Sequence, residues 1–250
     1  MKRIINLLAL LLVTVMLLTS CSYVTDVLFP PDYKQITNDI FTKYIEMNVV
    51  VLAEHENKYY GLTNQGSGVI YGEESGYYYC LTNAHVVEYN DYYADLSFYV
   101  MDCYGYKYNA TLIHADRNRD LAVVRFKYGN ERLYVADLAE SDPREGENVI
   151  AISSSEHIMN SVTYGKIKGY DKIKIYDDKG NDDTRVTFDV IRHDAHFLGG
   201  GSGSALLNLD MELVGINYAT STDRDGIFVW GYAVSVSHIR EYLEENHLMK

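Results

Sequence analysis

The stretch GGGSGSALLN, residues 199–208, decides how the rest of the chain is interpreted. Three glycines precede Ser202, and an apolar run begins at Ala205. Because glycine accepts backbone angles that other residues cannot, such a run can turn several N–H groups toward one point. A hydroxyl beside convergent N–H groups provides the nucleophile and the oxyanion hole that acyl transfer requires. Glycine- and serine-rich runs also form flexible linkers, so this interpretation needs support from elsewhere in the chain.

Two earlier motifs supply that support. The run TNAHVV (82–87) places His85 just after an apolar strand, and DRNRDLAVV (116–124) places Asp120 at the mouth of another strand. Either residue alone would be a structural histidine or a turn aspartate. The chain order His, Asp, Ser is that of the chymotrypsin triad, whereas α/β-hydrolases and subtilisin use other orders. Ser204 also stands where the Gly-x-Ser-x-Gly elbow of α/β-hydrolases requires glycine.

Short runs of β-branched and aromatic residues recur along both halves of the chain. Several alternate with period two, which is typical of half-buried strands. Many short strands at regular spacing predict closed barrels or sandwiches. A short helix is expected at 37–46 and another at 238–248. The predicted strands are 48–53, 66–71, 77–82, 96–100, 106–114 and 121–126, then 149–153, 161–169, 185–192, 205–208, 212–218 and 227–236.

Over residues 40–245 the chain resembles the trypsin-like serine proteases and, within them, the bacterial HtrA/Deg proteases. The stretches that carry the resemblance, in collinear order, are GSGVIY (66–71), LTNAHVV (81–87), DLAVV (120–124), SVTYGKIKG (161–169), DA (194–195), GGSG (200–203), LVGIN (213–217) and GYAV (231–234). The resemblance implies an all-β fold of two antiparallel six-stranded β-barrels with a C-terminal helix. The expected peptidase domain covers 37–250, with barrels at about 47–136 and 137–236 and the helix at about 237–248.

The resemblance also implies roles for the motif residues. His85 would be the general base, Asp120 would orient it, and Ser202 would attack the scissile carbonyl as in a serine endopeptidase. The N–H groups of Gly200 and Ser202, with Gly201 between them, would form the oxyanion hole. Imidazole suits the base because it titrates near working pH, and a carboxylate behind it stabilises the imidazolium. The alternative from another class is a catalytically inactive trypsin-fold lipoprotein that acts as a binding module.

The substrate pocket of this fold is walled by residues before the nucleophile and by a later strand. The expected pocket residues are His196, Phe197, Leu198, Ile216, Asn217 and Tyr218. They include no Asp, Glu, Lys or Arg, and a buried charged side chain without a partner is costly. We therefore expect cleavage of proteins or peptides after small or aliphatic residues.

The chain departs from the HtrA pattern next to the nucleophile. The family usually has Asn at Gly201 and Gly-Pro at Ser204 and Ala205. Ser204 resembles the glutamyl endopeptidase and exfoliative-toxin group. Asn217 and Phe197 stand where that group has its glutamate-reading histidine and its threonine, so glutamate specificity is not expected.

Residues 1–20 read as a secretory signal peptide, with Lys2 and Arg3 before an apolar run at 4–18. The following Leu18-Thr19-Ser20-Cys21 resembles the lipobox of bacterial lipoproteins, in which the cysteine is lipidated. An ordinary signal peptide with an incidental cysteine is the alternative. We expect an exported protein held at the bacterial cell membrane by lipid on Cys21, with 21–36 as a tether. No peptide-binding module is expected after the final helix.

Charge and composition exclude some partners. Because residues 1–20 carry two basic residues and no acidic one, their removal takes the formal net charge from −13 to −15. Such an acidic body argues against nucleic acid as a partner. The histidines show no metal-ligand spacing and read as incidental, except His196 near the pocket, so no cofactor or metal is expected. Cys80 and Cys103 form either a disulfide or two buried thiols. The sequence does not indicate an oligomeric state.

Overall fold

The computed structural model describes residues 30–56, 61–88, 96–129, 132–155, 158–176 and 179–250. The predicted signal peptide and Cys21 lie outside these residues. The chain divides into two compact units, Met1–Thr37 and Asn38–Lys250, and each is described by itself. Residues 30–37 are the described part of the first unit and include the beginning of helix α3 (Tyr33–Thr42). Within the described ranges, no helix is long and apolar enough to cross a membrane.

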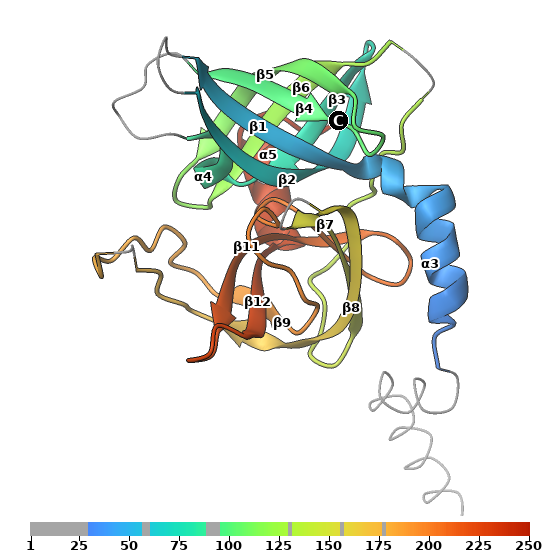
Figure 1. Cartoon of the computed structure of the whole chain (residues 1–250). Coiled ribbons are helices and arrows are strands. Elements are labelled where there is room, and N and C mark those ends of the chain that lie inside the picture. Colours follow the sequence, from blue (N-terminus) through green and yellow to red (C-terminus); the bar gives the residue numbers. More distant parts are fainter. Residues whose placement is uncertain (1–29, 57–60, 89–95, 130–131, 156–157, 177–178) are drawn as a thin grey trace, which may run out of the picture. The chain divides into compact units, whose positions relative to one another are not determined.

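The second unit contains two closed antiparallel barrels of six strands each, as predicted (Figure 1). The first barrel has the order β1-β2-β3-β6-β5-β4, and the second has the order β10-β11-β12-β9-β8-β7. The strands of the first barrel are β1 (Asn48–Glu56), β2 (Gly61–Glu74), β3 (Tyr77–Thr82), β4 (Ser97–Met101), β5 (Lys107–Asp116) and β6 (Leu121–Lys127). Those of the second are β7 (Asn148–Ser155), β8 (Ile158–Asp171), β9 (Val190–His193), β10 (Ala205–Leu207), β11 (Leu213–Thr222) and β12 (Phe228–Ser235).

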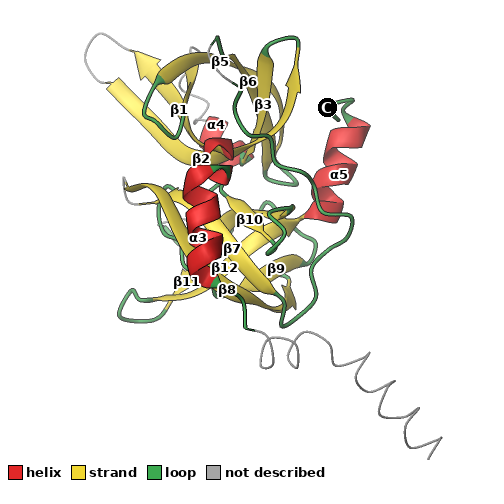
Figure 2. Cartoon of the chain, turned by 90° about the vertical axis from the view of Figure 1, so that its right-hand side faces the viewer, coloured by secondary structure: helices red, strands yellow, loops and turns green. Residues whose placement is uncertain are grey.

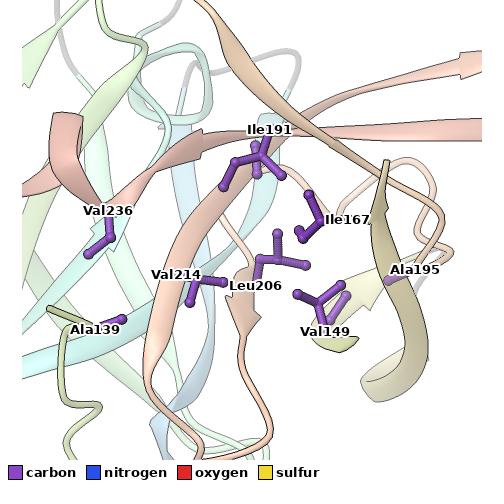
Figure 3. Packing of buried hydrophobic residues seen from close by; sticks show 10 residues of the cluster. Ala139, Val149, Ile167, Ile191, Ala195, Leu206, Val214 and Val236 are labelled. Atoms are coloured by element: carbon purple, nitrogen blue, oxygen red, sulfur yellow. The ribbon is translucent and has the colours of Figure 1, made fainter. Parts of the chain in front are cut away.

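Apolar side chains from facing strands fill the second barrel (Figure 3). The residues of this core include Val149, Ile167, Ile191, Leu206 and Val214, which are all almost completely buried. Burial of one such side chain stabilises the fold by about 1.5–3 kcal/mol. The core therefore gives the loops at the barrel's edge a rigid support.

Helix α5 (Val236–Glu245) follows the second barrel and returns to the first (Figure 2). The fully buried Tyr242 donates its hydroxyl proton to the backbone oxygen of His114 on β5, at 3.2 Å. The Arg119 guanidinium pairs with the carboxylates of Glu241 and Glu245 at 3.5 and 2.9 Å. Through these contacts α5 fastens one barrel to the other.

Helix boundaries differ from the sequence expectation by a few residues. The helix expected at 37–46 is α3 at Tyr33–Thr42, followed by a separate 3₁₀ turn at Tyr44–Met47. The final helix begins at Val236 and ends at Glu245, rather than covering 238–248. A four-residue helix, α4 (Ala84–Val87), carries His85 and was not predicted.

The strand expected at 185–192 was wrong for its first half, because the ladder of β9 begins only at Val190. In the residues before β9, the alternating side chains pack individually against the rest of the protein. Val186 is buried, and the Phe188 ring lies 3.8 Å from the His238 ring of α5, measured between centroids. Arg185 makes ion pairs with residues of the first barrel.

Both cysteines expected in the first barrel are free thiols, so the disulfide alternative is wrong. Cys80 lies on β3 and Cys103 follows β4, and both are buried. Burial raises the pKa of both thiols, and for Cys103 burial and the neighbouring Asp102 carboxylate raise it to about 12. Because the thiolate is the reactive form, both groups are inert packing residues.

Candidate active site

His85 is positioned by hydrogen bonds around the short helix α4. Asn64 on β2 donates its side-chain N–H groups to the backbone oxygens of His85 and Val86, both at 2.9 Å. Asn83, the residue before α4, donates from its side chain to the backbone oxygen of Asp120 at 2.8 Å. Asn64 and Asn83 therefore hold the helix and the aspartate in one arrangement.

Asp120 binds His85 through both carboxylate oxygens. Its Oδ2 lies 2.7 Å from His85 Nδ1, and its Oδ1 accepts the backbone N–H of His85 at 2.9 Å. The Asp120 side chain is 4% exposed, whereas that of His85 is 33% exposed. With Nδ1–H bonded to the carboxylate, Nε2 is the nitrogen left to accept a proton.

Asp120 adopts the left-handed backbone conformation, with φ of 50°. This conformation costs a residue with a side chain about 1 kcal/mol. The hydrogen bonds from Asn83 and His85 offset that cost. The backbone strain at Asp120 is therefore compensated by hydrogen bonds that the same residue accepts.

The turn that carries Ser202 requires glycine at position 203. Gly203 has φ of 86°, which favours glycine. A Cβ at this position would also overlap the backbone oxygen of Ser67 and the hydroxyl of Thr82, both in the first barrel. The backbones of the two barrels approach each other so closely here that no side chain fits.

Ser67 on β2 fastens the turn that carries Ser202 to the first barrel. Its backbone N–H donates to Ser202 O, and its hydroxyl donates to Gly200 O, both at 2.8 Å. The same hydroxyl accepts the backbone N–H of Ser154 on β7, also at 2.8 Å. Ser67 is fully buried, so these bonds are not exchanged with water. We call these three contacts the Ser67 clasp.

The clasp holds two carbonyl groups of the turn, while two N–H groups of the turn are bonded within the second barrel. Gly201 N–H donates to Leu198 O at 2.9 Å, and Gly203 N–H donates to Asn217 O at 2.7 Å. The N–H groups of Gly200 and Ser202 donate to no acceptor in the described ranges. These two are the groups predicted for the oxyanion hole.

Ser202 and α4 meet at Gly66. A Cβ at Gly66 would lie 2.9 Å from Ser202 O and 2.5 Å from a methyl group of Val86, the residue after His85. Among the described residues, no hydrogen bond links Ser202 Oγ with His85. The structure therefore shows the His85–Asp120 pair formed and the turn that carries Ser202 fastened next to it.

The predicted pocket residues divide by exposure. Phe197, Ile216, Asn217 and Tyr218 are buried, Leu198 is half-buried, and His196 is exposed. Ser204, the other serine of this turn, is also buried. Asn217 Nδ2 donates to Ser204 Oγ at 2.9 Å. The side-chain amide of Asn217, on β11, therefore supports the turn that carries Ser202 from the second barrel.

His193, which read as incidental in the sequence, completes this buried chain. Its Nε2 lies 2.9 Å from Asn217 Oδ1, so Nε2–H is the donor. Burial lowers the pKa of His193 to about 4, which keeps the ring neutral near neutral pH. Its spacing gave no signal, because the contact depends on how β9 and β11 pack.

In the part of the chain that the structure describes, no group of three or more His, Cys, Asp or Glu could hold a metal ion.

Comparison with known families agrees with this geometry. Residues 66–216 match the Trypsin-like peptidase domain, a range that includes His85, Asp120 and Ser202. The chain belongs to the trypsin-like peptidase family. Its sequence is also similar to HtrA-type and DegP-like proteases.

Three relatives illustrate this similarity. The Serine protease Do-like HtrA of Bacillus subtilis is 32% identical over 186 residues, 73% of this chain and 39% of the relative. Serine protease HTRA1 of Xenopus tropicalis is 35% identical over 73% of this chain and 36% of the relative. A probable periplasmic serine endoprotease, DegP-like, of Chlamydia pneumoniae is 30% identical over 72% and 36%. The chain thus spans less than half the length of these relatives.

The Ser67 clasp generates a test. Ser67→Ala would leave Gly200 O and Ser154 N–H buried without their partner, which costs about 1–3 kcal/mol. Because the turn loses one of its two hydrogen bonds to Ser67, we expect the rate of labelling by a fluorophosphonate to fall about tenfold or more. Denaturant unfolding and labelling kinetics measure the two effects.

Ser235→Ala is the matched control, because it also removes a buried hydroxyl, one that donates to Asp142 at 3.1 Å beside α5. It should lose comparable stability and label at the wild-type rate. Equal labelling of Ser67→Ala and wild type would contradict a role of the clasp in holding the turn.

Proposed function

We propose that this trypsin-like peptidase is a serine endopeptidase that hydrolyses peptide bonds in proteins. The observation that carries the proposal is the His85–Asp120 pair beside a turn whose carbonyl groups are fastened and whose Gly200 and Ser202 N–H groups are unused in the described ranges. This arrangement suits a reaction in which negative charge develops on a carbonyl oxygen.

The reaction divides into acylation and deacylation. His85 Nε2 takes the proton from Ser202 Oγ as that oxygen attacks the scissile carbonyl carbon, and the carbonyl oxygen becomes an oxyanion bound by the two N–H groups. The imidazolium then gives its proton to the leaving amine as the C–N bond breaks. Water attacks the acyl-enzyme with His85 again as base, which releases the carboxylic acid and restores Ser202. Asp120 stabilises the imidazolium in both halves.

Ser204 does not fit the nucleophile role. Its hydroxyl is buried and already accepts a hydrogen bond from Asn217. Ser202, in contrast, is only half-buried. Ser204 therefore lacks the access to substrate that a nucleophile requires.

Active-site labelling separates the two serines. We expect a fluorophosphonate to label the wild-type protein and Ser204→Ala, and to leave Ser202→Ala unlabelled, because only Ser202 Oγ, deprotonated by His85, attacks the phosphorus and displaces fluoride. Equal labelling of wild type and Ser202→Ala would exclude Ser202 as the nucleophile. Absence of label on the folded wild-type protein would favour the binding-module alternative.

We further propose a shallow, uncharged pocket. A Cβ at Gly231 on β12 would lie 2.5–2.8 Å from ring atoms of His193 and Phe197, so these rings fill the space beside that strand. The neutral His193 offers no charge to an acidic side chain. The nearby Asp194 is engaged by Lys168 Nζ at 2.7 Å and by the Lys166 N–H, which leaves it poorly placed to bind a basic side chain.

A peptide library tests this pocket. We expect cleavage after Ala, Val and similar small or aliphatic residues, with differences of about 1–3 kcal/mol per methylene. Phe197→Ala should shift the preference toward larger side chains such as Leu, because it removes the ring beside Gly231. Dominant cleavage after Lys, Arg or Glu by the wild-type protein would contradict the uncharged pocket.

We also propose that the protein is exported and anchored through lipid on Cys21. The support is the sequence of residues 1–21 and a DegP-like relative whose name describes it as periplasmic. With a formal charge of −15 after removal of residues 1–20, the acidic body would gain little from anionic lipid, so the anchor rests on the acyl chains.

Detergent partition tests the anchor. The wild-type protein should enter the detergent phase and Cys21→Ala should stay in the aqueous phase, because a diacylglyceryl group supplies the membrane affinity. A Cys21→Ala protein that still partitions into detergent would contradict anchoring through this residue.

A further inference from the structure

An ion cluster joins the two barrels behind the His85–Asp120 pair. The guanidinium of Arg185 lies 3.3 Å from Glu88 Oε2 and 4.0 Å from Asp120 Oδ1. Glu88 follows α4 directly, three residues after His85, and its Oε2 also binds Arg117 Nε at 2.8 Å. A cation of the second barrel therefore stands beside the carboxylate that orients the histidine.

Arg185 reaches this place from the segment between β8 and β9. The neighbouring Val186 is buried and the Phe188 ring packs against the His238 ring, so the segment is held immediately after Arg185. The Arg185 and Glu88 side chains are each 23% exposed, whereas Arg117 is 67% exposed. Charges that are partly buried are screened less by water and salt than exposed ones.

The two arginines stabilise the charged form of the Glu88 carboxylate in this cluster. Burial raises the pKa of Glu88, the nearby Asp120 raises it further, and Arg117 and Arg185 oppose the increase. The remaining titratable group that faces Asp120 is the Tyr218 hydroxyl of β11; burial, and then the Asp120 charge, raise its pKa. The groups around the His85–Asp120 pair are therefore one carboxylate, two guanidinium groups and one phenol.

We propose that Arg185 is a positioning residue that holds the β8–β9 segment against Asp120 and sets the pH range in which His85 accepts a proton. A cation at Asp120 competes with the imidazolium for the carboxylate, whereas Glu88 favours the imidazolium. The two partners of one ion pair therefore act on His85 in opposite directions. The effect on catalysis rests on the proposed endopeptidase function.

The opposite effects expected of Arg185 and Glu88 on the titration of His85 provide the test. In Arg185→Gln the imidazolium loses a repelling charge, so the titration midpoint of the His85 ring should move up. In Glu88→Gln the imidazolium loses an attracting charge, and the midpoint should move down. Arg185→Lys keeps the charge and should restore most of the wild-type value.

The primary measurement is NMR titration of the His85 ring signals, assigned by their loss in His85→Asn. It does not need turnover, so it stands even if fluorophosphonate labelling shows that the proposed function fails. Where the wild-type protein is active, the acid limb of kcat/KM against pH should move in the same directions. Arg117→Gln is the matched control, because Arg117 also binds Glu88 but is mostly exposed, and its midpoint should move less than that of Arg185→Gln.

Opposite displacements in Arg185→Gln and Glu88→Gln support the proposal, since a purely structural tether would change rates or stability in both variants without opposite signs. An unmoved midpoint in Arg185→Gln, or displacements of the same sign, would overturn it. If Arg185→Gln does not fold, Glu88→Gln and Arg185→Lys still decide, because an unmoved midpoint in Glu88→Gln contradicts the electrostatic role.

Discussion

The site depends on the hydrogen bonds that Ser67 makes across the seam between the barrels. His85 and Asp120 belong to the first barrel, whereas Ser202 belongs to the second. Ser67 binds the carbonyl groups of Gly200 and Ser202 from one side, and its hydroxyl binds the second barrel again at β7. Because every partner is a backbone group of a rigid strand or turn, the clasp fixes the turn rather than one side chain.

The rest of the site follows from this close approach. The turn can approach β2 only with glycine at position 203, and Gly203 N–H then bonds Asn217 O below. The buried chain of His193, Asn217 and Ser204 supports the turn from the second barrel. Ser67 binds the carbonyl groups of the turn, and the second barrel binds the N–H groups of Gly201 and Gly203. The N–H groups of Gly200 and Ser202 then have no acceptor among the described residues, as the proposed oxyanion hole requires. Strain at Asp120 is tolerated because its neighbours bond both its carboxylate and its carbonyl.

Strand periodicity predicted closed barrels or sandwiches, and the family resemblance carried by the motifs around positions 85, 120 and 202 implied the double barrel. Both could be found in the sequence because they are local signals. Sequence reasoning missed α4, since four residues are too few for a helical period. It also missed Ser67 and Arg185, whose partners lie far away in the chain and depend on how the barrels meet. The expected strand at 185–192 shows where strand prediction from periodicity fails. An alternating pattern indicates that every second side chain is buried, and this burial occurs both in a hydrogen-bonded strand and where single side chains pack against the barrels.

The central claim is that the fastened turn presents Ser202 Oγ and two N–H groups to one carbonyl. A crystal structure of the protein after reaction with a peptidyl phosphonate tests it most directly. The account predicts a covalent bond from phosphorus to Ser202 Oγ, a phosphonyl oxygen within hydrogen-bond distance of the N–H groups of Gly200 and Ser202, and an intact Ser67 clasp. A bond to another residue, or a phosphonyl oxygen turned away from both N–H groups, would contradict it.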